Sequence, residues 1–405
     1  MKQINLLSSV SEAYLSSDEP VSNQDLYACV AADTPISKHE VTDIQEVGES
    51  KTKHNLYHRK IRWIQQSLKQ QGIIQRVKQS HWEMTAQAKI KLRAIKEGNR
   101  IIALSTKHGV CLWSSSDDVF KDVIDEPIHL ILTSPPYPLK TPRAYGNVDV
   151  RAYVEFVCEA LEPIVKKMAQ GASLALNVSN DIFEDKSPAR STYLERLIIA
   201  IEDELGLSKM DTLQWVSNKA PGPIAWASKK RYQLNVGYEP ILWFCNNPHL
   251  CFADNRRVLM PHEDKHKKFI ESGGLKTATV NADGNYRKKA GSFSNRTDGK
   301  IPRNVLNFSN YCHSGRKVGR YAKSLGIAPH SAKMPVPLAS FLIQYLSRPN
   351  DLVVDPFAGT LTTAEAAEHN DRRWVCTEKI WEYIRQSFVR FGDDTFFNPA
   401  FLNVG

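Results

Sequence analysis

The chain has 405 residues, 42% of them hydrophobic and 24% charged, an ordinary globular composition that predicts two or three structural units and excludes a disordered or fibrous protein. The formal net charge is +9 but uneven: residues 1–50 carry −7, residues 51–100 carry +11 and residues 254–324 carry +10. Two basic blocks of this size favour a polyanion such as DNA as the partner, although a single basic block is often only a solvated surface.

Apolar runs are too short to span a bilayer, and the N-terminus lacks a signal-peptide pattern, so we expect a protein of the cell interior with no membrane partner. The seven cysteines are scattered and form no Cys-x-x-Cys pair or His/Cys set at zinc spacing. We therefore expect reduced thiols and no metal site.

Residues 1–95 predict a domain of three helices followed by a hairpin. Apolar side chains recur at helical spacing over 3–15, 22–30 and 57–69, and a hairpin is predicted over 73–84. The pattern resembles a winged-helix domain, in which the third helix enters the major groove of DNA. A small packing or dimerisation domain is the alternative. The basic residues expected to contact DNA from the third helix are Arg59, Lys60 and Arg62.

From residue 128 onwards, short apolar runs alternate with helical patterns. Buried strands that alternate with helices form a mostly parallel sheet with helices on both faces, so we expect an α/β fold. The predicted strands are 128–132, 174–178, 212–217, 240–245, 351–355 and 374–377. The predicted helices are 151–169, 191–205, 338–347, 362–369 and 381–391.

The segment Thr133-Ser134-Pro135-Pro136-Tyr137 directly follows the first of these strands, where ligands bind in open α/β sheets. The prolines have no N–H, so carbonyl groups there can accept hydrogen bonds without competing donors. An exocyclic amine donates two hydrogens, which Ser134 Oγ and the Pro135 carbonyl can accept, leaving the nitrogen more nucleophilic. Tyr137 offers a flat face on which an extruded base can stack.

Ser-Pro-Pro-Tyr after an apolar strand resembles the catalytic motif of the amino-methyltransferases of DNA, whose serine form is typical of N4-cytosine enzymes and whose aspartate form is typical of N6-adenine enzymes. The resemblance covers residues 105–392. It implies a permuted Rossmann-like domain that uses S-adenosylmethionine on double-stranded DNA. The catalytic residues that it implies are Ser134, Pro135, Pro136 and Tyr137.

A second motif, Asp355-Pro356-Phe357-Ala358-Gly359-Thr360, follows the strand 351–355, and Gly359 permits the close approach of a cofactor. The next strand ends at Glu378, a carboxylate that can accept both ribose hydroxyls. The resemblance implies that the motif holds the methionine part of S-adenosylmethionine and that the segment 330–335 closes over it. Leu361 stands where the family has glycine, so the loop is expected to differ in shape. The cofactor-binding residues expected are Thr133, Lys333, Asp355, Pro356, Phe357, Gly359, Thr360 and Glu378.

The catalytic motif precedes the cofactor motif, which is the family's β arrangement. It implies a catalytic half over 105–250, a target-recognition region over 251–328 and a cofactor-binding half over 329–405. The segments 215–223 and 238–244 resemble the base-pocket region. The residues expected to line that pocket are Lys219, Pro223 and Trp226, with a core position as the alternative for Trp226. The further DNA contacts expected are Arg143, Arg256, Arg257, Arg287, Lys288, Lys289, Arg316 and Lys317.

We therefore expect a site-specific methyltransferase that modifies N4 of a flipped cytosine, acting in a restriction-modification system beside a cognate endonuclease. The expected location is the prokaryotic cytoplasm, at the nucleoid through DNA; the sequence leaves the oligomeric state open. Three alternatives stay open: methylation of N6 of adenine, methylation of RNA, and a DNA-binding regulator with an inactive methyltransferase fold. The last rests on Leu361 and on a missing Gly-Asp, since 113–117 reads Trp-Ser-Ser-Ser-Asp. That departure leaves the adenine contact of the cofactor unassigned.

Overall fold

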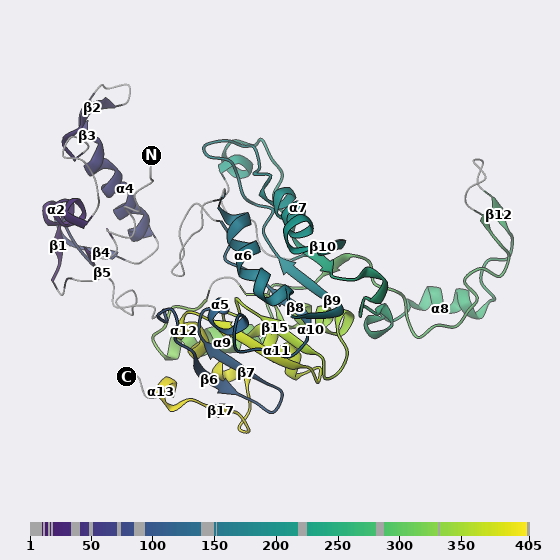
Figure 1. The fold of residues 1–405 in the computed structure, drawn as a ribbon. Helices are drawn as coiled ribbons and strands as arrows, with labels where there is room; N and C mark the ends of the chain where they lie inside the picture. Colours follow the sequence, from purple (N-terminus) through teal and green to yellow (C-terminus); the bar gives the residue numbers. More distant parts are fainter. Residues whose placement is uncertain are drawn as a thin grey trace. The chain divides into compact units, whose positions relative to one another are not determined.

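The computed structural model divides the chain into two compact units (Figure 1). One comprises residues 94–320 and 330–405, and the other comprises residues 1–93 and 321–329. None of the described helices is long and apolar enough to cross a membrane. The residues that the structure describes are 10, 13–14, 17, 19–33, 41–47, 52–70, 74–84, 94–138, 150, 152–217, 225–280, 287–330 and 333–402.

Ten strands of the described residues form one sheet in the unit 94–320/330–405, in the order β14-β10-β11-β9-β8-β15-β16-β7-β6-β17. The block from β9 to β7 is parallel, whereas β11 is antiparallel to β9 and β6 is antiparallel to β7. The mostly parallel α/β sheet is therefore confirmed. The strands are β6 Ile101–Ser105, β7 Gly109–Trp113, β8 Ile128–Thr133, β9 Met168–Asn177, β10 Ser208–Val216, β11 Tyr238–Cys245, β14 Val305–Asn307, β15 Leu352–Asp355, β16 Arg373–Glu378 and β17 Phe396–Phe397.

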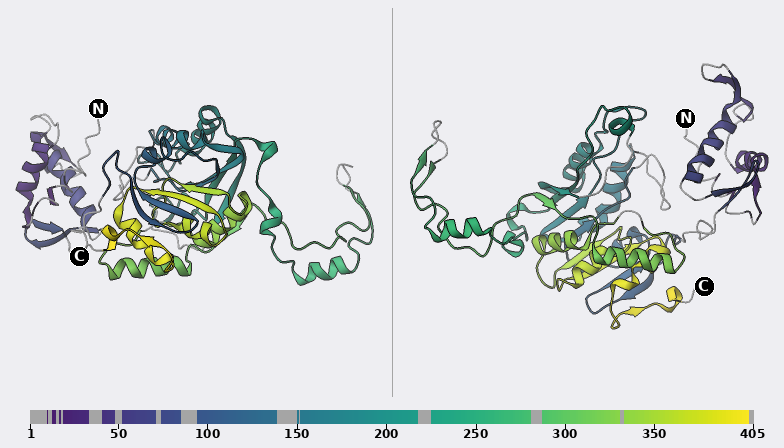
Figure 2. Two further views of the ribbon diagram at one scale, coloured as in Figure 1. Left: turned by 60° about the horizontal axis from the view of Figure 1, so that its bottom comes forward. Right: turned by 180° about the vertical axis from the view of Figure 1, so that it is seen from behind.

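Helices cover both faces of this sheet (Figure 2). α6 (Tyr153–Val165) and α7 (Tyr193–Leu205) pack against each other on one face, and α10 (Val336–Leu346) and α11 (Thr362–Glu368) do so on the other. In α6, α7 and α10 the buried side chains recur at helical spacing on one apolar face, whereas α11 is buried on all sides. The other helices of this unit are α5 Ser116–Phe120, α8 Asp264–Glu271, α12 Trp381–Ser387, α13 Pro399–Leu402 and α9 His313–Ser324, whose residues from 321 onwards are assigned to the other unit.

The predicted elements from 128 onwards are present, with shifted boundaries at α6, β9 and β10, which begins at Ser208 rather than at 212. The predicted helix 151–169 ends at Val165, and β9 begins at Met168 rather than at 174, because Met168 already pairs with Ile128 at the start of β8. The β6–β7 hairpin was not predicted. Its first strand is half exposed and so lacks the continuous apolar run of a buried strand.

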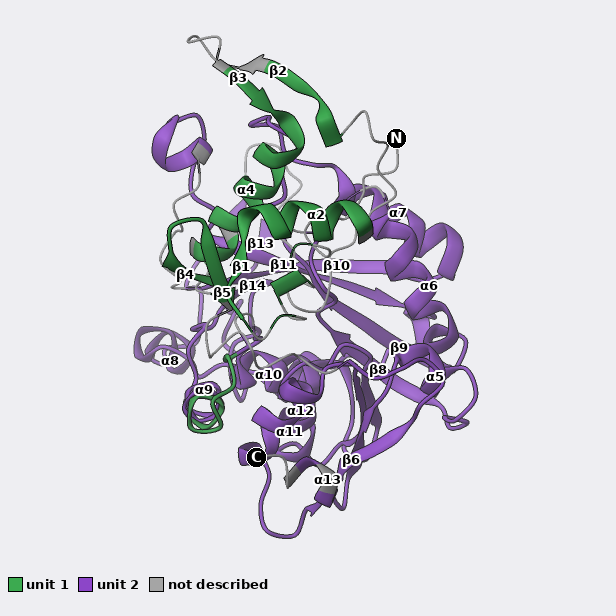
Figure 3. Cartoon of the chain, turned by 90° about the vertical axis from the view of Figure 1, so that its left-hand side faces the viewer, with its two compact units in different colours: residues 1–93, 321–329 green, residues 94–320, 330–405 purple. Residues whose placement is uncertain are grey.

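The unit 1–93/321–329 is drawn in green in Figure 3, and its buried side chains form a small core of their own. α2 (Asn23–Asp33) is capped by Ser22, whose Oγ accepts the Asp25 N–H at 3.1 Å. α4 (Leu56–Gln70) buries Tyr57, Ile61, Ile64 and Leu68, the positions whose spacing predicted it. Of the predicted first helix, only 10 and 13–14 lie within the described residues, and they are helical.

The strands of this unit form two small sheets. β1, β5 and β4 form a three-stranded sheet in the order β1-β5-β4, and β2 and β3 form a hairpin between α2 and α4 that was not predicted. The predicted hairpin over 73–84 corresponds to β4 and β5. The strands are β1 Val21–Ser22, β2 Ile44–Val47, β3 Thr52–Asn55, β4 Ile74–Lys78 and β5 His81–Met84.

Candidate active site

Four neighbouring parallel strands end in polar side chains at one edge of the sheet: β9 in Asn177, β8 in Thr133, β15 in Asp355 and β16 in Glu378. The carboxyl ends of parallel strands are where ligands bind in open α/β sheets. Thr133 Oγ1 donates a hydrogen bond to Asp355 Oδ1 at 2.6 Å. The strand ends that carry the predicted catalytic and cofactor motifs are therefore joined directly.

The Asp355 carboxylate organises the loop that follows β15. Its Oδ1 also accepts the backbone N–H of Phe357 at 3.1 Å, and its Oδ2 accepts Thr363 Oγ1 at 2.6 Å. Burial raises the pKa of Asp355 to about 6, although these hydrogen bonds act to lower it. Because both oxygens are bonded within the protein, Asp355 acts by holding Thr133 and the loop in place.

Glu378 lies beside this loop. Its Oε2 accepts the backbone N–H of Gly359 and its Oε1 accepts that of Ile380, both at 2.8 Å. Burial raises the pKa of Glu378 to about 7, against the effect of these backbone hydrogen bonds. Gly359 has φ +51, and a Cβ there would lie 3.6 Å from Nε2 of His330. Glycine therefore leaves a space beside Glu378 that a side chain would fill.

Leu361, the departure from the family pattern, is accommodated in this loop. It has the left-handed φ of +57 that glycine adopts more readily, and its side chain is fully buried. The backbone strain of about 1–2 kcal/mol is offset by burial of the leucine, about 1.5–3 kcal/mol. The preceding Thr360 is fixed by Arg390, whose Nε donates to the Thr360 carbonyl at 2.6 Å.

Behind the loop, Arg390 forms an ion pair with Glu365, and the two side chains are only 1% and 7% exposed. Ser314, near the start of α9, donates to Glu365 Oε2 at 2.6 Å. Sequence interpretation missed this pair, because each residue alone looks like an ordinary charge on a helix. The pair supports the cofactor loop from the side of the helices.

The segment before α10 approaches the same loop. His330 packs edge-on against Tyr383 with ring centroids 4.4 Å apart, and Lys333 Nζ donates to the His330 carbonyl at 2.7 Å. Burial, together with the positive charge of Arg390, lowers the pKa of Lys333. A half-buried cation bonded to His330, the residue that lies next to Gly359, suits an anionic ligand group such as a carboxylate.

The Tyr137 hydroxyl is the centre of the hydrogen bonds around the predicted catalytic motif. Ser134 Oγ donates to it at 3.3 Å, and it donates to Asn177 Oδ1 at 3.2 Å or to Glu239 Oε2 at 3.1 Å. Burial, together with the negative charge of Glu239, raises the pKa of Tyr137, so this hydroxyl stays protonated at neutral pH. Asn177 Nδ2 is buried and has no hydrogen-bond partner among the described residues.

Sequence interpretation missed Asn177 as a residue of this site, and it did not single out Glu239 within the segment 238–244. Asn177 looked like an ordinary strand residue. Glu239 is the second residue of β11, and its signal was an acid near the start of an otherwise apolar strand. The antiparallel pairing of β11 with β9, in which Ile241 lies opposite Asn177, brings Glu239 to the carboxyl edge. Pro135 is buried and Pro136 half-buried beside this cluster.

The model of the DNA methylase family matches residues 128–389, a range that contains the four strand ends and the Ser134–Tyr137 motif. The chain belongs to the DNA methylase family. Type II methyltransferase M.PvuII of Proteus hauseri is 32% identical to this methylase over 294 residues, which cover 72% of this chain and 86% of the relative. M.BglII of Bacillus subtilis is 25% identical over 284 residues, 70% of this chain and 69% of the relative.

A solved structure is similar along the same part of the methylase. It is described as PvuII DNA methyltransferase (cytosine-N4-specific); its TM-score is 0.57 and its identity 27%, over 73% of this chain and 90% of that chain. The expected membership of the DNA amino-methyltransferases is thus confirmed. Residues 1–127 lie outside the family match.

The predicted base-pocket residues are only partly described. Lys219 and Pro223 lie outside the described residues of the methylase. Trp226 lies in η1 (Ala225–Lys229), where its ring stacks on Tyr232 with centroids 6.2 Å apart and planes 14° apart. Trp226 is half-buried, so the alternative that placed it in the core is not supported.

Most of the predicted DNA contacts are exposed, but Arg257 is not. Its guanidinium donates to the carbonyl groups of Phe252 and Tyr345, and burial lowers its pKa. Arg257 therefore anchors η3 (Asn255–Val258) to α10 and is a structural residue rather than a DNA contact. Arg256 pairs with Asp254 at 2.8 Å and stays 83% exposed.

The remaining predicted contacts lie on three elements or beyond the described residues. Lys288 is half-buried and lies over the Phe293 ring at 5.6 Å, and Arg143 lies outside the described residues. The exposed ones are Arg59, Lys60 and Arg62 on α4, Arg287 and Lys289 at β13 (Arg287–Lys288), and Arg316 and Lys317 on α9.

Proposed function

We propose that this methylase transfers a methyl group from S-adenosylmethionine to the N4 amine of a cytosine in double-stranded DNA. The observation that carries the proposal is the position of Ser134, which contacts Tyr137 and directly follows Thr133, itself bonded to Asp355 of the cofactor loop. The serine form of the motif is typical of N4-cytosine enzymes. The similar PvuII enzyme is described as cytosine-N4-specific.

The residues at the carboxyl edge suit S-adenosylmethionine, which when bound supplies an electrophilic methyl group on a sulfonium. Each Glu378 oxygen accepts one backbone N–H and keeps a further lone pair for a ribose hydroxyl. Lys333 suits the methionine carboxylate, and Gly359 leaves room for the cofactor. Asp355 and Thr360 act indirectly, by shaping the loop. Pro356 and Phe357 complete this loop.

Ser134 and Pro135 would orient the target amine. Ser134 Oγ and the Pro135 carbonyl each accept one amine hydrogen, which aims the nitrogen lone pair at the methyl group. The buried Asn177 Nδ2 is a donor for the ring nitrogen beside the amine. Cytosine and adenine both have an acceptor there, so Asn177 does not discriminate between them.

The hydrogen bonds around Tyr137 supply a path for the proton that the amine must lose. As the nitrogen gains its methyl group, its surplus proton passes to Ser134 Oγ, Ser134 passes its own proton to Tyr137, and Tyr137 passes its proton to Glu239 Oε2. The path ends in a neutral methylated amine and a protonated Glu239, which returns the proton to water.

The target base would have to leave the duplex to reach Ser134, because its amine is otherwise held in a base pair. Trp226, Lys219 and Pro223 are the proposed lining of its pocket, with Tyr137 as the stacking surface. The exposed cations of the region 251–328 would hold phosphates and read base edges. As in restriction-modification systems, a cognate endonuclease would act at the same site, in the cytoplasm at the nucleoid.

The unit 1–93/321–329 is proposed as an additional DNA-binding domain of winged-helix type. Three observations support this: the order of helices followed by the β4–β5 hairpin, the exposed Arg59, Lys60 and Arg62 on α4, and Trp63 on the same helix, which is 72% exposed. A buried core on one face of α4 and cations on the other leave that basic face available to a duplex.

The proposal is tested by tritiated methyl transfer from S-adenosylmethionine to unmethylated genomic DNA, followed by nucleoside analysis. Label in N4-methylcytosine supports it. Label in N6-methyladenine would move the activity to the other base, and label confined to RNA in a parallel reaction would change the substrate. If no label is transferred and calorimetry detects no cofactor binding, the loop at Leu361 is inactive and a DNA-binding regulator is the better description.

A further inference from the structure

The segment 229–237 runs from the last residue of η1 to the residue before β11. It contains three consecutive cations followed by an isolated exposed leucine. Lys229, Lys230 and Arg231 are all exposed, and none of them pairs with an acid among the described residues. Three residues later, Leu234 is 91% exposed, more than any other large apolar side chain in the described part of the chain. Exposure of a whole leucine to water is unfavourable unless a partner covers it.

The residues just before Leu234 are held in place by hydrogen bonds. The N–H of Tyr232 donates to the Trp226 carbonyl at 2.8 Å, and the two rings stack. Gln233 Nε2 donates to the Pro188 carbonyl, and Gln233 and Val236 are half-buried. The inward-facing neighbours thus fix the segment while Leu234 faces solvent.

The segment lies at the carboxyl edge of the sheet, where the chemistry takes place. β11 is antiparallel to β9, so its first residues lie beside the end of β9, and Glu239 there contacts the Tyr137 hydroxyl at 3.1 Å. Leu234 precedes Glu239 by five residues, which span at most about 18 Å even when fully extended. Leu234 is therefore within reach of a duplex whose target base enters the site.

We propose that the segment 229–237 grips the duplex beside the target, with Lys229, Lys230 and Arg231 on phosphates and Leu234 inserted into the base stack where the flipped cytosine leaves a gap. This rests on the proposed function, because a gap arises only when a base is extruded. Apolar side chains that enter a base stack are a known way to hold DNA in an opened form. The cations, which have no acidic partner in the described part of the chain, supply the charge complementarity to the DNA backbone.

The role proposed for Leu234 differs from recognition of the DNA sequence. A leucine carries no hydrogen-bonding group, so Leu234 stabilises the opened duplex whatever base it faces, whereas polar side chains in the region 251–328 can read base edges. The consequence is specific: loss of Leu234 should matter only while the target base is still paired.

The test compares Leu234→Ala with wild type on two duplexes of one sequence, taken from the site that wild type methylates in plasmid DNA. In one duplex the target base is paired, and in the other it faces an abasic position. We expect Leu234→Ala to lower kcat/KM about 10- to 100-fold on the paired duplex, the worth of one buried leucine. On the abasic duplex the loss should be less than about threefold, because the base is already unpaired.

Three further variants keep the result interpretable. Leu234→Met should retain most activity on both duplexes. Ile199→Ala, which removes an aliphatic side chain that is 57% exposed on α7, should match wild type. Replacing Lys229, Lys230 and Arg231 by Gln should weaken binding equally on both duplexes and reduce the slope of log affinity against log salt by about 3.

Equal activity of Leu234→Ala and wild type on the paired duplex would overturn the proposal, and so would the same loss on both duplexes. The proposed function fails in a different way, through absence of N4-methylcytosine from the wild-type reaction. The comparison between the two duplexes can still be made on whichever base wild type methylates.

Discussion

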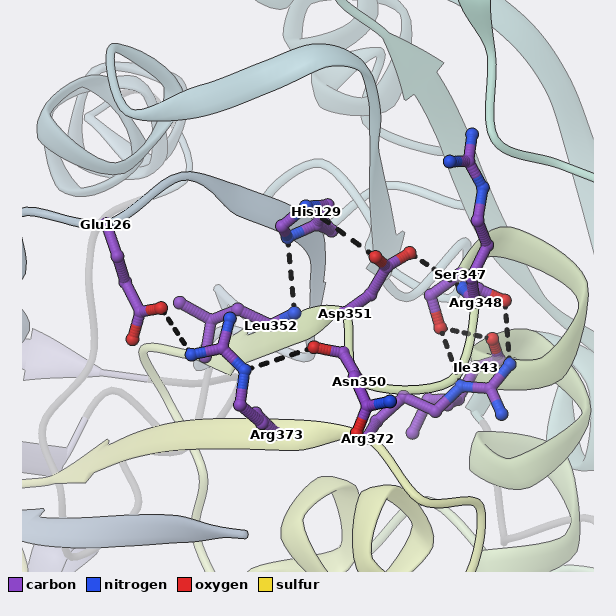
Figure 4. A network of polar contacts seen from close by, with 10 residues as sticks. All are labelled: Glu126, His129, Ile343, Ser347, Arg348, Asn350, Asp351, Leu352, Arg372 and Arg373. Atoms are coloured by element: carbon purple, nitrogen blue, oxygen red, sulfur yellow. Dashed lines mark hydrogen bonds and ion pairs between the residues drawn. The ribbon is translucent and has the colours of Figure 1, made fainter.

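The two ends of the central parallel strands carry polar groups of different kinds. At the amino ends, charges are paired (Figure 4): Arg373 bonds to Glu126 and to the Asn350 carbonyl at 3.0 Å, and His129 lies 3.6 Å from Asp351. At the carboxyl ends, Asp355 and Glu378 are held only by hydroxyl and backbone N–H donors, with no cation bonded to either carboxylate among the described residues.

The difference separates stability from chemistry. Polar contacts at the amino ends join the segments that lead into the strands. The two carboxyl-end acids have pKa values raised from 3.8 to about 6 and from 4.5 to about 7, so the folded state binds more protons than the unfolded state between about pH 4 and pH 7. Stability contributed by these groups therefore falls as pH rises through that window. Buried acids whose raised pKa values lower the stability of the fold are typical of a site that binds a ligand.

The largest effect should come from Ser134→Ala. Without Oγ, one amine hydrogen has no acceptor and the proton path loses its first member, so we expect kcat to fall about 1000-fold, as for other positioned hydrogen-bonding groups. Affinity for S-adenosylmethionine, measured by calorimetry, should stay within about twofold, because Ser134 has no bond to the cofactor loop. Unchanged turnover would show that the carboxyl edge does not use this serine.

Glu239→Gln should lower kcat about 100-fold, the usual worth of a proton acceptor in catalysis. Glutamine keeps a carbonyl oxygen for the Tyr137 hydroxyl but cannot take a proton. KM for DNA and cofactor affinity should therefore change little, and Glu239→Asp should restore part of the rate.

Combining Glu239→Gln with Tyr137→Phe sharpens this test, because both residues belong to one proposed path. The double variant should be about as slow as the slower single variant. If the two losses multiply instead, Glu239 and Tyr137 act independently, and Glu239 is only a structural neighbour.

Cofactor affinity should depend on pH through Glu378. The ribose hydroxyls donate to the ionised carboxylate, so binding favours the form that has lost its proton. Affinity should rise by at most about tenfold per pH unit up to about pH 7 and level off above it. Calorimetry at constant ionic strength measures this, and Glu378→Gln should bind weakly without the rise. If the cofactor affinity of the wild type does not change between pH 5.5 and 7.5, Glu378 does not bind the ribose hydroxyls.

The positions of the site residues in their strands also explain which of them could be predicted from the sequence and which could not. Thr133, Asp355 and Glu378 were identifiable because each directly follows or ends a short apolar run, and parallel strands bring such ends to one edge. Glu239 comes at the start of its strand and reaches the same edge only because β11 runs antiparallel to β9. No local pattern reveals that pairing, nor the buried contact of Arg390 with Glu365 across the tertiary structure.

The smallest predicted effect is that of Ser347→Ala. It is the same Ser-to-Ala change as Ser134→Ala, made at the amino ends of the strands instead of the carboxyl ends. Ser347 Oγ is buried, donates to the Ile343 carbonyl at 2.6 Å and accepts from Arg372 Nε at 3.2 Å (Figure 4). Removing it leaves the Arg372 donor without this partner and should lower the free energy of unfolding by about 1–2 kcal/mol in urea titrations. The folded variant should keep wild-type kcat, because no bond links Ser347 to the carboxyl edge. Ser134→Ala should do the reverse, so a large loss of kcat in Ser347→Ala would mean that the two ends of the sheet are coupled rather than separate.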